Sequence, residues 1–297
     1  MSNFFRQKEK TEKEIKRDIK KSYKRVSNNL VKRLSMINPD SMTYDYLRQT
    51  AKYLENEYKR LNKRLNKSIE KAVITTIEGY TQSQVDFYSE LCKPLSTSFQ
   101  DMFLKVNEIA LDNIISGKIY GDNIKLSKRL WGNHKKTIQT INDILTDGFT
   151  AKKGSKEIAK DLEAYVNPDY KQEYDKFTIH PKSRNKVEFN SYRLANTYIN
   201  HAYQTAAKES AKENPFIEEI EWLSGTDSKV CKLCTERNHK RFPKDKIPLD
   251  HPLGRCTYIP VMEDDLEEIA KQLKNWVDGG SNEKLDNWFN KYDVDRR

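Results

Sequence analysis

The chain has 297 residues, of which 36% are hydrophobic and 33% charged, and it carries a net charge of +10. This length allows one or two domains with a substantial core, and the small numbers of Gly and Pro, 10 and 9, favour a protein rich in helices. No apolar run reaches the roughly 18 residues of a membrane span, and the N-terminus lacks the apolar core of a secretory signal. We therefore expect no membrane contact and folding in a reducing cytoplasm, where structural disulfides are rare.

The positive charge is concentrated toward the N-terminus. Residues 1–75 contain 20 Lys and Arg against 9 Asp and Glu, a net of +11, whereas the rest of the chain has a net of −1. A polyanion such as double-stranded DNA would be attracted to this end. A solvated, lysine-rich pair of helices without a partner explains the same pattern equally well.

Residues 11–36 and 41–78 have the apolar spacing of two amphipathic helices. In the first segment the apolar stripe is Ile15, Ile19, Tyr23, Val26, Leu30 and Leu34. In the second segment it is Leu47, Ala51, Leu54, Tyr58, Leu61, Leu65 and Ile69. Asn38-Pro39-Asp40 separates the two, and Gly79 is expected to end the second. The pattern predicts a long antiparallel hairpin with a narrow, coiled-coil-like seam.

Further helices are predicted through the middle of the chain. They are expected over about 81–93, 97–116, 133–147, from Ser155 onward, and over 189–213. Gly117 and Gly148 are expected to close the second and third of them, and Pro215 follows the last. Residues 167–187 show no period and contain two Pro, which predicts a loop or a domain junction.

The C-terminal third changes character. Short strands are predicted over 217–223 and 257–261, and helices return over 263–277 and 282–292. The sequence thus predicts a mainly α protein, with a long N-terminal helical hairpin, a helical body and a small C-terminal α+β unit. The expected domains are the basic helical hairpin over 1–80, the helical body over 81–166, a linker or loop over 167–188, and the α+β unit over 189–297.

The stretch between the two predicted strands holds three of the four cysteines of the chain. Zinc takes four nitrogen or sulfur ligands in a tetrahedron, and two cysteines spaced as Cys-x-x-Cys can bend round one ion. Cys231 and Cys234 supply such a pair, and His251 and Cys256 can supply the other two ligands. This set would be a structural zinc site that cross-links a polar loop. His239 is an alternative ligand, less suited because polar and charged residues flank it.

Two other interpretations of these residues stay open. The cysteines can be reduced thiols packed against Trp222 and Phe242, with His251 hydrogen-bonded. A redox pair is the weakest alternative, because no βαβ pattern surrounds the Cys-x-x-Cys. Outside this stretch, we expect three isolated side chains to be structural: the thiol of Cys92 in the core, and the imidazoles of His180 and His201.

The cysteine stretch and the segment before it also resemble a known family. A helix rich in small residues (193–207) is followed by Trp222, by Asp227 shortly before the Cys-x-x-Cys pair, and by the closing motif His251-Pro252-Leu253-Gly254-Arg255-Cys256. With these features, residues 124–262 resemble the phage head morphogenesis family, the minor head proteins named after phage Mu protein F. The family has a further cysteine where this chain has Gly254. If the site binds metal, the fourth ligand is then His251, or the site is a degenerate remnant.

The resemblance implies a minor head protein of a tailed phage, a low-copy capsid component made in the host cytoplasm and retained in the virion. Its expected partners are the portal, scaffold and major capsid proteins, and the basic N-terminal region would face packaged DNA. No nucleophile-elbow, Walker, dinucleotide-binding or zinc-protease motif occurs, so we expect no enzyme activity. The alternatives are a toxin-like or nuclease effector with a related module, and a zinc-containing, nonspecific DNA-binding protein.

Overall fold

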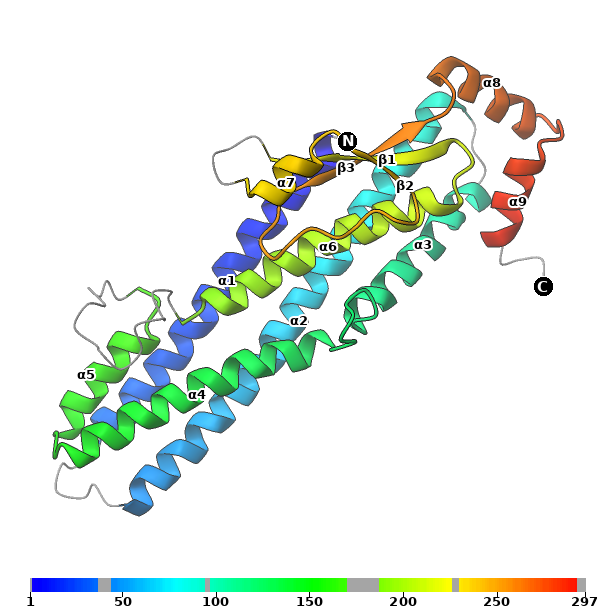
Figure 1. The fold of residues 1–297 in the computed structure, drawn as a ribbon. Helices are drawn as coiled ribbons and strands as arrows, with labels where there is room; N and C mark the ends of the chain where they lie inside the picture. Colours follow the sequence, from blue (N-terminus) through cyan, green and yellow to red (C-terminus); the bar gives the residue numbers. More distant parts are fainter. Residues whose placement is uncertain (1, 37–43, 94–96, 170–186, 226–229, 293–297) are drawn as a thin grey trace. The chain divides into compact units, whose positions relative to one another are not determined.

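The computed structural model describes residues 2–36, 44–93, 97–169, 187–225 and 230–292. Helices dominate this part of the chain, and a small antiparallel sheet belongs to its C-terminal part (Figure 1). The predicted mainly α fold, with a long N-terminal hairpin and a small C-terminal α+β unit, is confirmed. None of the described helices combines the length and apolar character that crossing a membrane requires.

The N-terminal hairpin consists of α1 (Ser2–Ser35) and α2 (Tyr44–Leu91). The apolar stripe predicted for the first helix is buried at every position. In α2 the buried members of the stripe are Leu54, Tyr58, Leu61, Leu65 and Ile69. Ala51 is half-buried, and the side chain of Leu47 lies outside the described residues.

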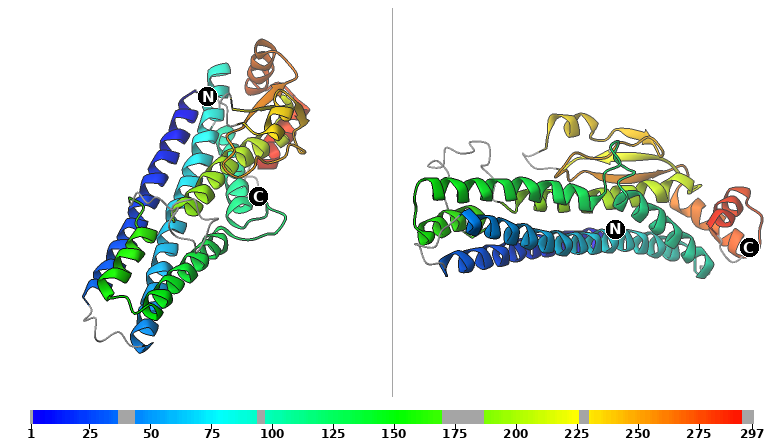
Figure 2. Two further views of the ribbon diagram at one scale, coloured as in Figure 1. Left: turned by 60° about the vertical axis from the view of Figure 1, so that its left-hand side comes forward. Right: turned by 90° about the horizontal axis from the view of Figure 1, so that it is seen from below.

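Polar contacts across the hairpin show that its two helices are antiparallel. The Asn29 side chain donates a hydrogen bond of 2.9 Å to Glu57, and the Arg33 guanidinium lies 4.5 Å from the centroid of the Tyr53 ring. Positions later in α1 thus face positions earlier in α2. Both views in Figure 2 show the two helices running side by side.

The prediction that Gly79 ends the second helix is wrong, because α2 continues through it to Leu91. A Cβ at position 79 would lie 3.1 Å from Oε1 of Gln7 and 3.5 Å from the ring of Phe4. The Phe4 ring in turn packs edge-on against Tyr80, with centroids 5.6 Å apart. Gly79 therefore allows α1 to approach closely, and this packing offsets the roughly 1 kcal/mol that glycine costs inside a helix.

The chain divides by its internal contacts into two compact units. Unit 1 comprises Met1–Glu12, Lys71–Asn123 and Asn196–Arg297, and unit 2 comprises Lys13–Glu70 and Ile124–Ala195. The domains expected from the sequence are consecutive segments, whereas these units interleave along the chain. The helices α1, α2 and α6 (Phe189–Glu213) contribute residues to both.

Unit 2 combines parts of the hairpin with α4 (Leu126–Thr150) and α5 (Ser155–Val166). α4 begins earlier than predicted and continues through Gly148, so that glycine does not close the helix. A Cβ at position 148 would lie 2.7 Å from Cγ1 of Ile158. Gly148 therefore lets α5 pack closely against α4. Most of residues 167–187, predicted to be a loop, lie outside the described residues.

Unit 1 contains the sheet, most of α6, and a core formed by several helices. Its remaining elements are α3 (Thr97–Ile115), β1 (Ile217–Leu223), α7 (Lys232–Arg237), β2 (Arg241–Pro243), β3 (Thr257–Met262), α8 (Leu266–Val277) and α9 (Glu283–Tyr292). The strands are antiparallel in the order β2-β1-β3. β2 was not predicted, because three residues are too short to show a period.

Cys92 is buried in the core cluster with Tyr88, Phe103 and Trp288, as expected for a core thiol.

Candidate metal centre

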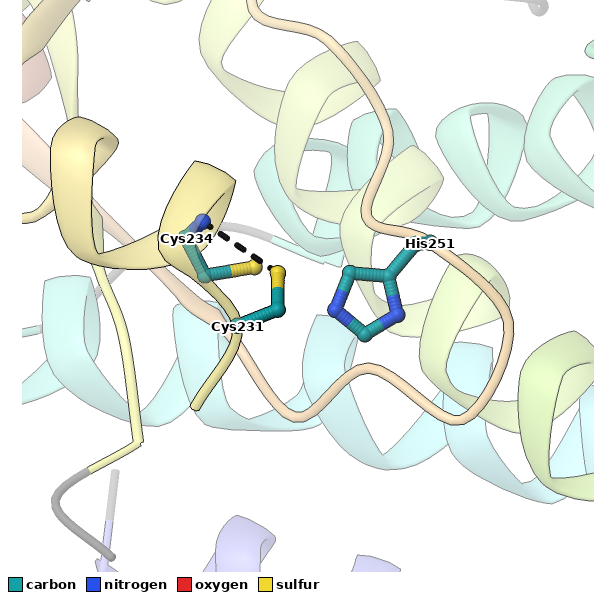
Figure 3. Close-up of side chains that lie close together, drawn as sticks. All are labelled: Cys231, Cys234 and His251. Carbon is teal, nitrogen blue, oxygen red and sulfur yellow. Dashed lines mark hydrogen bonds between the residues drawn. The ribbon is translucent and has the colours of Figure 1, made fainter. Parts of the chain in front are cut away.

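The cysteine and histidine side chains singled out in the sequence lie on α7 and on the segment between β2 and β3. Cys231 is the N-cap residue of α7, and its Sγ accepts a hydrogen bond of 3.5 Å from the backbone N–H of Cys234. This contact bends the Cys-x-x-Cys segment so that its two sulfurs lie side by side, with the His251 ring facing them (Figure 3).

The donor atoms form two sets that share one cysteine. The ligand atoms of Cys231, Cys234 and His251 lie within 4.8 Å of one another, and so do those of Cys234, Asp250 and Cys256. The four predicted ligands thus belong to one cluster with Cys234 at its centre, and Asp250 is added to them. Thiolate, imidazole and carboxylate are the donors that zinc takes in proteins, so the cluster could bind a metal ion such as zinc.

Asp250 organises the loop that carries the last two predicted ligands. Its side chain is completely buried. One carboxylate oxygen accepts the backbone N–H of His251 at 2.8 Å, and the other accepts the backbone N–H of Cys256 at 2.9 Å. Oδ1 also lies 3.6 Å from the Sγ of Cys234, whose thiol donates to it. A single buried carboxylate therefore links three residues of the cluster.

A row of buried polar side chains on one face of α6 holds this loop in place. The row comprises Thr197, Asn200, His201 and Gln204. The Gln204 amide accepts from the N–H of Asp250 and donates to the carbonyl of Cys256, both at 3.1 Å. His201, expected to be structural, donates from Nε2 to the Asp250 carbonyl at 2.9 Å. This row was not predicted from the sequence, although the helical spacing of its members, in a helix rich in small residues, was the available signal.

Gly254 is required by the position of the Asp250 side chain. A Cβ at position 254 would lie 2.0 Å from Cγ of Asp250, a separation that no side chain can tolerate. The backbone N–H of Gly254 also donates to the His251 carbonyl at 2.8 Å, which closes a tight turn. The carboxylate thus fills the space that any side chain at position 254 would need.

The electrostatic environment differs between the half-buried Cys231 and the buried cysteines. The backbone N–H of Cys234, which donates to the Cys231 sulfur, lowers the pKa of the Cys231 thiol. Burial raises the pKa of Cys234 and of Cys256, and the nearby Asp250 carboxylate raises both further. A hydrogen bond to the Pro252 carbonyl raises the pKa of His251. The two buried thiols therefore need a bound cation to lose their protons near neutral pH.

Of the other residues considered as site candidates, His239 lies apart from the cluster and Trp222 lies against Cys256. His239 forms a 2.8 Å contact with the Glu221 carboxylate, and it belongs to neither set of donor atoms. Trp222 is fully buried, and its ring lies 6.4 Å from that of Phe242. All four cysteines are free thiols. Asp227 and His180 fall outside the described residues.

A metal ion with four protein ligands has no open position for a substrate, so the chemistry that this arrangement offers is a structural cross-link. Such an ion would join α7 to the segment between β2 and β3.

Comparisons of the chain with protein families, with curated proteins and with solved structures find no match.

Proposed function

We propose that the chain is a minor head protein of a tailed phage, a low-copy structural component that acts in head assembly at the portal vertex. In this function the C-terminal part of unit 1 docks on the portal protein during procapsid assembly, in the presence of the scaffold and major capsid proteins. The protein then stays inside the capsid of the finished virion. Its role is structural rather than enzymatic.

The observation that carries this proposal is the convergence of the residues that resemble the phage head morphogenesis family. They come from α6, β1 and the segment before β3, yet they meet in one place. The Gln204 side chain of α6 donates to the Cys256 carbonyl at 3.1 Å, and the Thr197 hydroxyl of α6 accepts the backbone N–H of Leu253 at 3.1 Å. The Trp222 ring of β1 lies 5.5 Å from the ring of Tyr258, which follows the closing motif by two residues. Residues that form a genuine family motif are expected to meet in space, so this convergence supports the proposal.

In this function the cluster of Cys231, Cys234, His251 and Cys256 binds zinc as a structural cross-link. Residues 244–256 contain neither helix nor strand, so few backbone hydrogen bonds of their own hold them in shape. A zinc ion would tie them to α7, and its binding free energy would stabilise the fold directly. The docking surface would then keep one conformation before the partner binds.

A basic groove in unit 2 favours double-stranded DNA as a further partner. It lies between α1 and α2, and its lining includes Lys21, Arg25 and Arg64 together with Asp18. Within the part of the chain that the structure describes, none of these three cations forms an ion pair. Cations that protein carboxylates do not neutralise are available to phosphate groups, and each phosphate contact releases counterions from the DNA.

Co-expression tests the assembly role. The tagged chain is expressed together with portal, scaffold and major capsid proteins from the genome that encodes it, and procapsids are purified by sedimentation. We expect the chain in the particles at low copy number and bound to isolated portal rings. Absence from the particles together with no binding to the portal would refute the proposal. Nuclease or toxin activity of the purified chain would instead support the effector alternative.

The DNA contact is tested by a salt titration of duplex binding. Replacing Lys21, Arg25 and Arg64 by Ala should weaken binding and reduce the slope of log affinity against log salt by up to about 2.7. A control removes the same charge from exposed lysines of the same unit, Lys125, Lys128 and Lys135. Equal losses in both variants, or no loss in the first, would contradict a contact through the groove.

A further inference from the structure

The buried set of donor atoms in the cluster contains a carboxylate that the sequence did not predict as a ligand. Asp250 is placed with Cys234 and Cys256, whose exposed fractions are only 2% and 3%. The His251 imidazole lies 3.8 Å from the carboxylate, near the limit of an ion pair, and carries a charge only when it is protonated, so the buried carboxylate is poorly neutralised. A divalent cation between the three side chains would neutralise the carboxylate and allow both thiols to ionise.

The separation of two of these atoms fits a shared metal ion. Cys234 Sγ and Asp250 Oδ1 are 3.6 Å apart. In a tetrahedral zinc site, with Zn–S of about 2.3 Å and Zn–O of about 2.0 Å, a sulfur and an oxygen ligand are about 3.5 Å apart. The ion would take the place of the proton that the thiol now shares with the carboxylate, and that proton would be released to solvent on binding.

The Asp250 carboxylate is held in place as a metal ligand should be. Ligating carboxylates usually accept further hydrogen bonds, which fix their orientation. Here each carboxylate oxygen accepts one backbone N–H, and Gln204 and His201 of α6 bind the Asp250 main chain. Oδ2 also accepts the Asn200 amide at 3.4 Å, whereas Oδ1 retains a lone pair for a metal once the Cys234 thiol has lost its proton. The carboxylate is therefore oriented before any ion binds.

His251 is less well placed than Asp250. Its side chain is 40% exposed, whereas the Asp250 side chain is completely buried, and Asp250 but not His251 shares a set of donor atoms with Cys256. We propose that zinc is bound by Cys231, Cys234, Asp250 and Cys256, with Asp250 in the place expected for His251. Cys231 belongs to this ligand set as the knuckle partner of Cys234. Its sulfur shares a set of donor atoms with Cys234 but not with Asp250 or Cys256, so it would move toward the ion on binding. The inference rests on the zinc binding in the proposed function, and it changes one of the four ligands.

X-ray absorption of the zinc-loaded full chain tests the ligand set directly. We expect three sulfur ligands and one oxygen ligand, without the outer-shell scattering that a bound imidazole produces. An imidazole signature would overturn the assignment of Asp250 and leave zinc binding intact. A chain that takes up no zinc from a solution of the metal would overturn both, while binding to the portal would still support the assembly role.

Two variants give an independent readout, the zinc affinity measured by competition with a chelator. His251→Ala should change this affinity by less than about tenfold, the lower end for loss of an outer-shell partner. The charge-transfer bands of the cobalt-substituted variant should match those of the wild type. Asp250→Asn should lower the affinity more than about 100-fold, beyond the usual outer-shell range.

A histidine outside the cluster supplies the matched control. His239→Ala removes an exposed imidazole of the same unit and should leave zinc affinity unchanged. A loss of more than about 100-fold in His251→Ala but not in His239→Ala would overturn the proposal. This comparison holds even if Asp250→Asn does not fold, because neither histidine lies in the core.

Discussion

His134 provides a quantitative test of the packing in unit 2. Its side chain is completely buried, and within the described residues neither ring nitrogen has a hydrogen-bond partner. The rings of Tyr23, Tyr58 and Trp131 surround it, with centroids 6.1, 5.5 and 6.4 Å away. Burial lowers the pKa of His134 to about 4, because an imidazolium in this environment would lose its solvation.

The lowered pKa makes the free energy of unfolding depend on pH. In the unfolded chain the imidazole pKa is about 6.5, so below that pH the unfolded state binds a proton that the folded state does not. Stability is therefore present above about pH 6.5 and is lost as the pH falls toward 4. The difference between the two pKa values amounts to about 3 kcal/mol in total, of which about 2 kcal/mol is lost between about pH 7.5 and pH 5.

Urea unfolding of His134→Phe and of the wild type, followed by circular dichroism at these two pH values, measures this contribution. Phenylalanine keeps the ring contacts and removes two buried nitrogens without partners, so the variant should be at least as stable near neutral pH. The wild type should lose about 2 kcal/mol more than the variant on acidification. The rest of the chain is identical in the two proteins, so its contribution cancels in the comparison. Equal losses in the free energy of unfolding of the two proteins would show that burial does not keep His134 neutral.

Three further substitutions test the packing and the metal centre. Gly148→Ala should destabilise the chain by about 1–3 kcal/mol, because the new methyl group would overlap the α5 side chain packed on it; a thermal transition at or above that of the wild type would contradict this contact. Tyr203→Phe leaves the buried N–H and carbonyl of Tyr258 without their partner, the Tyr203 hydroxyl, and should cost about 1–3 kcal/mol in urea titration, so an unchanged midpoint would argue against the pairing. Cys256→Ser should abolish stoichiometric zinc binding and lower Tm more than Cys92→Ser does. Similar Tm losses with no zinc in the wild type would favour packed thiols without a metal.

Features set by local backbone chemistry could be predicted from the sequence, whereas features set by tertiary contact could not. α6 has its predicted bounds, because Pro215 lacks the N–H that would continue the helix. Gly79 and Gly148 carry the same local signal for a helix end as Gly117, yet only Gly117 lies beyond a helix end, with a positive φ of 82°. The other two remain helical because a neighbouring helix packs where their side chain would be.

The candidate site likewise has one part that could be predicted from the sequence and one part that could not. Cysteine and histidine are rare in this chain, so their spacing alone placed four of them in one cluster. Asp250 is one of 44 acidic residues, and an aspartate in a proline-rich loop is an ordinary turn residue. Its importance comes from complete burial, which depends on Asn200, His201 and Gln204 in a distant helix. The sequence pattern around Asp250 cannot indicate these contacts with a distant helix.

The polar row on α6 also has a consequence for the order of folding. The contacts that shape the loop around Asp250 join residues 46 to 56 positions apart, all reaching back to a helix that is synthesised first. Contacts of such long sequence separation form late, after the local helix. A fragment that starts at β1 would contain every candidate zinc ligand named above. It would lack α6, the helix whose side chains hold the loop in its conformation. In a nascent chain, too, the cysteines stay open to solvent until they dock on α6, and exposed thiolates are the form most easily oxidised.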